Sequence, residues 1–332
     1  MNNQVAMEKP MTKVINQVIT DRYALYHADT VEVAAGLPSD SVGFSVFSPP
    51  FETLFTYSNS DRDMGNARST EDFWSQYHYL IREQMRVMKP GRLVAIHCMN
   101  LPTSKQNHGY IGIRDFRGEI IRAYQDAGFI FHSEVCIWKD PVVAMQRTKA
   151  LGLLHKTLCK DSSMSRQGIP DYLVIMRKPG ENDTPISGAL THYVGDDVPP
   201  VFKPVEYDDG RCAWAPANES ASVIDIWQRY ASPVWIDINQ TDTLNFREGR
   251  DSDDERHICP LQLDVIERAL QLWSMPDDLV WSPFMGIGSE GYVSVKMGRR
   301  FVGAELKESY FNLAVRNMEQ AGKSQYDMFG GL

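Results

Sequence analysis

The feature that most constrains this chain is the tetrapeptide Ser48-Pro49-Pro50-Phe51, which follows an apolar run at residues 42–47. The run is rich in β-branched and aromatic side chains and is typical of a buried central strand. Two consecutive prolines cannot continue a hydrogen-bonded ladder, so the strand must end there and the chain must turn at its carboxyl end. In an open α/β sheet this is the edge where ligands bind. The tetrapeptide therefore predicts a ligand site at a sheet edge.

This corner offers three groups for recognition: the Ser48 hydroxyl, the Pro49 carbonyl and the Phe51 ring. A planar base with an exocyclic amino group needs such a set, because two acceptors can take its N–H groups while a ring stacks on its face. The alternative is structural, with a Pro-Pro loop after a strand and Phe51 covering the core. Four residues alone leave both interpretations open.

Short apolar runs alternate along the chain with segments of helical periodicity. Strands are expected at residues 23–27, 42–47, 93–98, 129–138, 172–176, 278–281 and 300–306. Helices are expected at residues 30–37, 71–88, 115–127, 260–273, 291–297 and 309–318, and residues 1–20 are expected to form a loose arm or a short helix. This alternation predicts an α/β fold, with a mostly parallel sheet covered by helices on both faces.

The net charge of the chain is −9, and the charged residues are distributed unevenly along it. Residues 179–256 carry 16 acidic and 6 basic side chains, a balance of −10, which leaves +1 for the rest. A basic stretch, expected to form a loop, interrupts the first part and is a candidate for phosphate contacts, with a solvated surface as the alternative. Its cationic residues are Lys139, Arg147, Lys149, Lys156, Lys160 and Arg166.

Composition narrows the remaining classes of protein. No apolar stretch approaches the roughly 20 residues of a membrane span, and the first 20 residues lack the layout of a signal peptide. The five cysteines are scattered and form no Cys-x-x-Cys pair, so neither a disulfide framework nor a metal site is expected. We expect a cytoplasmic protein without a membrane partner.

A second landmark is the glycine-containing segment 282–291, which lies between an expected strand and an expected helix. Gly286 and Gly288 let the backbone approach a ligand closely. Glu305 stands at the end of the next expected strand, where a carboxylate can accept hydrogen bonds from both ribose hydroxyls of an adenosine group. Together these residues predict a site for a cofactor that contains a nucleoside.

The two landmarks together resemble the amino-methyltransferases of DNA, which methylate adenine N6 or cytosine N4 with S-adenosylmethionine. Ser48-Pro49-Pro50-Phe51 resembles the catalytic tetrapeptide of that family, and Phe284-x-Gly-x-Gly-Ser resembles its cofactor loop. The tetrapeptide precedes the cofactor loop, as in the circularly permuted β class. The resemblance implies a Rossmann-like sheet with an antiparallel strand and an inserted recognition region.

The resemblance also implies a division of the chain and a role for each matching residue. Residues 1–178 would form the catalytic half, 179–256 the target-recognition region, 257–320 the cofactor-binding half and 321–332 a tail. Ser48 and the Pro49 carbonyl, with Pro50 holding the corner, would bind the amino group, and Phe51 would stack on a flipped-out base. The implied cofactor residues are Asp29, Phe284, Gly286, Gly288, Ser289 and Glu305.

Two residues invite comparison with the family, one for its contact with the cofactor and one for the choice of target base. Ser282 stands where the family usually has an aspartate facing the cofactor amino group. Serine at the first tetrapeptide position, as in Ser48, is more usual for cytosine N4, so we expect cytosine N4 as the target. We expect the partner to be double-stranded DNA and the enzyme to be a monomer or homodimer.

Several alternatives stay open. They are adenine N6 as the target; RNA, a protein side chain or a small molecule as the substrate; and a catalytically idle relative that binds nucleic acid. An NAD-dependent oxidoreductase is disfavoured, because no Gly-x-Gly-x-x-Gly occurs near the N-terminus.

Overall fold

The computed structural model describes residues 13–51, 64–67, 69–103, 105, 109–148, 153–188, 190, 192–196, 202–206, 209, 211–216, 223–245 and 260–329. Its strands are β1 (Asn16–Ile19), β2 (Tyr23–His27), β3 (Val42–Phe47), β4 (Met88–Met99), β5 (Leu101–Thr103), β6 (Gly112–Arg114), β7 (Ile130–Ile137), β8 (Asp171–Arg177), β9 (Phe202–Glu206), β10 (Cys212–Pro216), β11 (Val234–Trp235), β12 (Leu279–Ser282) and β13 (Arg300–Glu305). Its α-helices are α1 (Thr30–Gly36), α2 (Thr70–Val87), α4 (Phe116–Asp126), α5 (Pro141–Thr148), α6 (His155–Lys160), α7 (Val223–Tyr230), α8 (Leu263–Trp273), α9 (Ser289–Lys296) and α10 (Glu308–Phe329).

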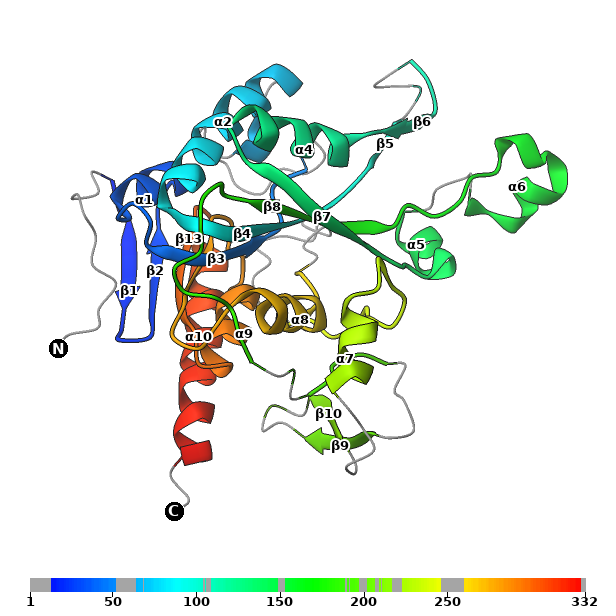
Figure 1. Ribbon diagram of the computed structural model, residues 1–332. Coiled ribbons are helices and arrows are strands. Elements are labelled where there is room, and N and C mark those ends of the chain that lie inside the picture. The colour runs from blue at the N-terminus through cyan, green and yellow to red at the C-terminus, as the bar shows by residue number, and fades with distance from the viewer. Residues whose placement is uncertain are drawn as a thin grey trace.

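A nine-stranded sheet in the order β1-β2-β13-β12-β3-β4-β8-β7-β11 forms the centre of the molecule. Helices α1, α2 and α4 cover one face, and α8, α9 and α10 cover the other, as Figure 1 shows and as the two main core clusters confirm. The sequences of the buried strands are continuously apolar because helices cover both faces of the sheet. The predicted α/β sheet is confirmed.

Strand directions decide which residues reach which edge of the sheet. Neighbours from β2 to β4 run parallel, whereas β8 runs antiparallel to both β4 and β7. The carboxyl ends of β3, β4 and β7 therefore share one edge with the amino end of β8. Residues widely separated in sequence meet there.

Three local expectations need correction. Residues 16–19, expected in an arm or short helix, form strand β1, which pairs antiparallel with β2. The basic stretch contains the short helices α5 and α6, which extend beyond the carboxyl end of β7 (Figure 1). Helix α10 continues to Phe329 and so includes most of the expected tail at 321–332, whose last three residues lie outside the described part.

A buried polar network fastens β3 to β12 below the edge where Ser48 stands. The Ser45 hydroxyl donates to the Trp281 carbonyl at 2.8 Å, and the Gln84 amide of α2 donates to Ser45 at 3.4 Å. Such groups are costly to bury unless they are paired, so this network favours one register between the two strands. The strand before the tetrapeptide and the strand before the glycine loop are thereby held side by side.

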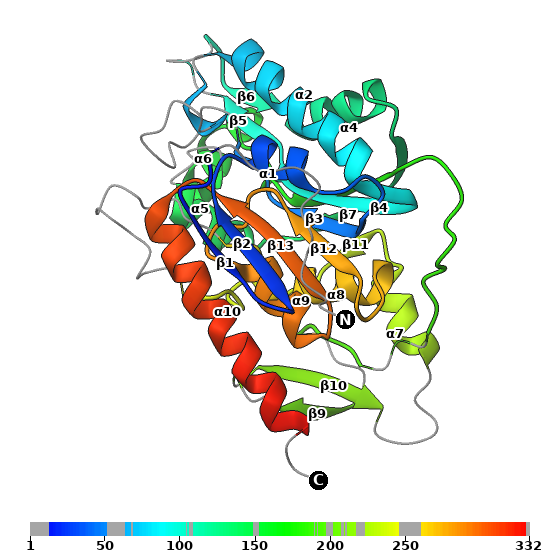
Figure 2. The ribbon, with the colours of Figure 1, turned by 90° about the vertical axis from the view of Figure 1, so that its left-hand side faces the viewer.

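The described parts of the acidic segment pack on α8 through one buried cation. Arg268 donates to the Asp237 carboxylate at 2.9 Å and to the Val194 carbonyl at 2.9 Å. Its guanidinium also lies 5.2 Å from the Tyr193 ring centre and 4.9 Å from that of Tyr230. A desolvated arginine with these partners forms a strong anchor. Figure 2 shows β9 and β10 below the sheet.

None of the helices in the described ranges combines the length and the apolar character that crossing a membrane requires.

Gly43 in β3 packs closely against a buried ion pair, and this packing predicts how a substitution there changes the free energy of unfolding. A Cβ at Gly43 would lie 2.6 Å from the Asp278 carboxylate, which forms a buried ion pair with Arg92. We expect Gly43→Ala to lower the free energy of unfolding by about 1–3 kcal/mol through overpacking. Gly322→Ala in α10 meets no atom within 4 Å and should raise it by roughly 0.5–1 kcal/mol. Urea unfolding of both variants checks this, and equal effects would contradict the packing argument.

Candidate active site

The carboxyl ends of β3 and β4 bring Ser48 and His97 into contact. These strands are parallel neighbours with Phe47 opposite Ile96, so the next residue of each chain falls at the same level. The Ser48 hydroxyl oxygen and His97 Nδ1 are hydrogen-bonded at 2.8 Å. His97 is buried, whereas Ser48 is half-buried and keeps part of its surface exposed.

Asp171 and Lys139 extend this contact into a chain of four groups. Asp171 is the first residue of β8 and lies opposite Met99 of β4. On its other side it pairs with Ile137 of β7, and Lys139 comes two residues after Ile137. His97 Nε2 lies 3.1 Å from Asp171 Oδ2, and Lys139 Nζ lies 2.5 Å from the same oxygen.

The charge on Asp171 follows from these neighbours. Burial alone would raise the pKa of the Asp171 carboxyl, but His97 and Lys139 outweigh burial and hold that pKa below its usual value. Asp171 is therefore a buried carboxylate at neutral pH, facing the imidazole whose other nitrogen bonds Ser48.

Sequence reasoning missed two of these four groups and gave a third another role. From the sequence, His97 is only one residue of an expected strand, and Asp171 precedes another without a predicted role. Lys139 was predicted to contact phosphate, whereas the structure places its ammonium on Asp171. The sequence does show a histidine and an aspartate at the ends of buried strands. That these two side chains meet follows only once β8 is known to run antiparallel to β4.

Aromatic rings connect the tetrapeptide to the glycine loop. Phe51 meets the edge of Phe116 with ring centres 6.2 Å apart, and Phe284 stacks on Tyr77 at 6.4 Å. Phe73 lies between them, contacting both Phe116 and Tyr77. Pro49 and Pro50 are buried, while Phe51 and Phe284 are partly exposed. The structure thus brings together the two predicted landmarks.

The glycine loop after β12 has the backbone that the sequence predicted. Gly286 and Gly288 have φ angles of 52° and 87°, in the left-handed region that favours glycine. A Cβ at Gly286 would meet no atom within 4 Å, whereas one at Gly288 would touch Ala314 at 3.2 Å. Gly286 therefore faces open space and Gly288 allows α10 to pack closely. The Ser282 and Ser289 hydroxyls are buried without a hydrogen-bond partner among the described residues.

Two predicted acidic positions lie at neighbouring strand ends. The Ala28 N–H donates to the Glu305 carbonyl at 3.1 Å, which places the residues after β2 and β13 side by side. One Glu305 carboxylate oxygen accepts the Lys307 N–H at 2.7 Å. Asp29 caps α1 by accepting the Val31 N–H at 2.9 Å, so it has a structural role as well.

Glu290 supplies a third carboxyl group near this loop. Burial raises the pKa of Glu290 to about 8, and the charge of Glu305 adds to that shift. The protonated form of Glu290 is thereby favoured, which lessens its repulsion of the Glu305 carboxylate.

The basic residues after Lys139 lie along the projecting segment. Lys156 and Lys160 are exposed one turn apart on α6, on the same side of the helix. Arg166 is half-buried and donates to the Gln167 carbonyl at 3.2 Å. The side chain of Arg147 and the whole of Lys149 lie outside the described residues.

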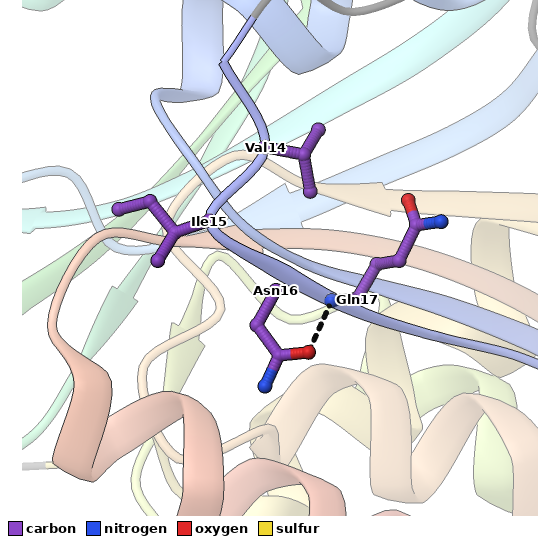
Figure 3. Close-up of a pocket in the computed structure, with 4 residues that line it drawn as sticks. All are labelled: Val14, Ile15, Asn16 and Gln17. Atoms are coloured by element: carbon purple, nitrogen blue, oxygen red, sulfur yellow. Dashed lines mark hydrogen bonds between the residues drawn. The ribbon is translucent and has the colours of Figure 1, made fainter.

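Two hollows occur away from the tetrapeptide. Figure 3 shows one of about 430 Å³, lined by Val14, Ile15, Asn16 and Gln17. It lies on edge strand β1, which β2, β13 and β12 separate from β3. A larger one of about 950 Å³ lies between the acidic segment and helices α8, α9 and α10. Neither contains Ser48 or His97 in its lining.

Comparisons with known proteins agree with this geometry. A family model described as DNA methylase matches residues 42–316. The type II methyltransferase M.BglII of Bacillus subtilis is 22% identical over 292 residues, which span 87% of this chain and 67% of that enzyme.

Two solved structures share the fold. TTHA0409 of Thermus thermophilus, complexed with S-adenosyl-L-methionine, superposes with a TM-score of 0.58 at 20% identity and covers 90% of this chain and 95% of its own. The PvuII DNA methyltransferase, described as cytosine-N4-specific, superposes with a TM-score of 0.55 at 13% identity and covers 94% of each chain.

Proposed function

The chain belongs to the DNA methylase family, and from this premise we propose that it methylates the exocyclic amino group of a flipped-out base in DNA, at N4 of cytosine. The observation that carries the proposal is the position of the Ser48 hydroxyl. It is fixed by His97 at 2.8 Å and stands at the end of β3, whose parallel neighbour β12 leads into the glycine loop. Acceptor and cofactor loop thus share one sheet edge.

S-adenosylmethionine is the cofactor that this family uses, and the residues present fit it. The open space beside Gly286 admits a close ligand, and the Ser282 and Ser289 hydroxyls are buried polar groups without partners among the described residues. Phe284 and Glu305 would bind its adenine ring and ribose. When bound, the cofactor supplies a methyl group activated by a positively charged sulfur.

The protein's own contribution is to make a poor nucleophile react. The lone pair of an exocyclic amine is delocalised into the base, so it must be localised on nitrogen before it can attack. Acceptors at Ser48 and the Pro49 carbonyl favour a pyramidal nitrogen, and this effect strengthens in the transition state. The partly exposed Phe51 face gives a surface on which the base can stack. Base flipping is the way in which methyltransferases reach a base that is stacked within a duplex.

The choice of base rests on Ser48. A neutral hydroxyl is a weaker acceptor than the carboxylate that the family more often uses for adenine N6. The PvuII enzyme, which shares the fold, is described as cytosine-N4-specific. Both points favour cytosine N4.

A further part of the proposal concerns where the enzyme acts and how DNA is held. We place the reaction on double-stranded DNA in the cytoplasm, by a monomer or homodimer; the free thiols of Cys98, Cys136 and Cys159 fit a reducing compartment. Lys156 and Lys160 would contact phosphates from α6. Recognition by residues 179–256 stays a prediction.

Nucleoside analysis tests the proposed reaction. Unmethylated duplex DNA is incubated with the protein and S-adenosylmethionine, digested and analysed by mass spectrometry. We expect N4-methylcytosine, formed far more slowly by Ser48→Ala, because that variant lacks the hydroxyl acceptor. N6-methyladenine would overturn the choice of base, and the absence of any methylated nucleoside would overturn the proposed function.

Salt-dependent binding tests the role of α6. Replacing Lys156 and Lys160 by glutamine should lower duplex affinity and reduce the slope of log Kd against log salt by about 1.8, because each phosphate contact contributes roughly 0.9. The control is Lys203→Gln, an exposed lysine on β9 in the acidic segment. If Lys203→Gln reduces the slope instead, the DNA interface lies on the acidic segment.

A further inference from the structure

We propose that His97, acting through Ser48, accepts the proton that the amino group must lose on methylation, and that Asp171 and Lys139 together control this acceptance. The inference rests on the proposed function and deepens it. It assigns a proton path to a Ser–His–Asp–Lys arrangement, buried at its His97 and Asp171 members, that base stacking and cofactor binding do not require.

The reaction leaves a proton to be removed. The amino nitrogen forms a bond to the methyl carbon while the bond from that carbon to sulfur breaks, and the sulfonium becomes a neutral thioether. The methylated nitrogen then carries one proton too many. In our proposal this proton passes to the Ser48 oxygen as the Ser48 proton passes to His97 Nδ1. The products are a neutral methylamino group, an intact serine and an imidazolium.

The hydrogen-bond geometry favours this direction of transfer. If Ser48 donates to His97 Nδ1, as the 2.8 Å contact allows, its oxygen is free to accept a proton from the base. The imidazole then carries its own hydrogen on Nε2, which lies 3.1 Å from Asp171 Oδ2. A carboxylate in this place holds the tautomer and stabilises the imidazolium, as in serine hydrolases. The four groups have the order needed for proton acceptance.

Lys139 adds a positive charge beside the aspartate, which the triad of a serine hydrolase does not contain. Its ammonium lies 2.5 Å from the same carboxylate oxygen that faces His97. It therefore balances the buried charge of Asp171 and opposes the positive charge that His97 gains. Next along β4, Cys98 is near the charges of Asp171, Arg117, Glu134 and Asp115. Arg117 and Glu134 pair with each other at 2.9 Å. Asp171 is the charged side chain in contact with His97, and Lys139 contacts Asp171 in turn.

The first test is a pH profile of single-turnover methyl transfer with the nucleoside readout. His97→Asn keeps an amide oxygen that can accept from Ser48 but cannot take up a proton. We expect the wild-type rate to rise with pH and level off, and the variant to be about 10²–10⁴-fold slower without that rise. S-adenosylmethionine affinity should stay unchanged. The control is His132→Asn, an exposed histidine on β7.

The second test separates proton acceptance from a purely structural role and needs no activity. The imidazole signals of His97 are titrated by NMR, with His97→Asn identifying them. Asp171→Asn should move the titration midpoint to lower pH, because the imidazolium loses its carboxylate and keeps the Lys139 cation nearby. Lys139→Met should move it to higher pH, because the opposing cation is gone. A structural role predicts no such opposite shifts.

The outcomes distinguish this inference from the proposed function. An active wild type together with a His97→Asn variant of unchanged rate and profile overturns the inference alone. Midpoints that do not move in opposite directions overturn the role of Asp171 and Lys139. Opposite shifts in a protein that methylates no nucleoside would overturn the proposed function while leaving the electrostatic coupling in place.

Discussion

The hydrogen bond between Ser48 and His97 is the contact on which the account depends. It joins the ends of two parallel strands at 2.8 Å and fixes a hydroxyl that the two following prolines leave at a turn. A serine free to rotate would be a poor acceptor for an amino group, because the acceptor must be in place before the transition state forms. The partners behind it convert a neutral hydroxyl into a directed acceptor. Position, rather than charge, is what the site provides.

The rest of the fold keeps this edge rigid. Ser45 and Gln84 hold β3 against β12 from within the core, and the aromatic wall from Phe51 to Phe284 joins the two loops above. Arg268 docks the acidic segment on α8, on the face of the sheet opposite α2. Rigid elements therefore position the chemistry, while the basic helix α6 projects from the same edge. This division suits an enzyme that must hold a long polymer and act on one base.

Local chemistry made much of this predictable from the sequence. Prolines after an apolar run located the end of β3, and the glycines located the loop between β12 and α9, because each depends on neighbours in the chain. His97 and Asp171 could not be placed, since their meeting depends on β8 pairing antiparallel with β4. The same pairing places Lys139, predicted to contact phosphate, against Asp171. Asp29 was expected at the cofactor, but the structure also shows it capping α1, a role that strand-end logic alone does not reveal.

A double-mutant cycle on Ser48 and His97 tests the central claim most directly. Single-turnover methyl transfer is measured for the wild type, Ser48→Ala, His97→Asn and the double variant. If the two residues act as one unit, the double variant is no slower than the slower single variant, because either change removes the same proton path. Independent roles would instead give a loss equal to the product of the two single losses. That multiplicative result would contradict the account.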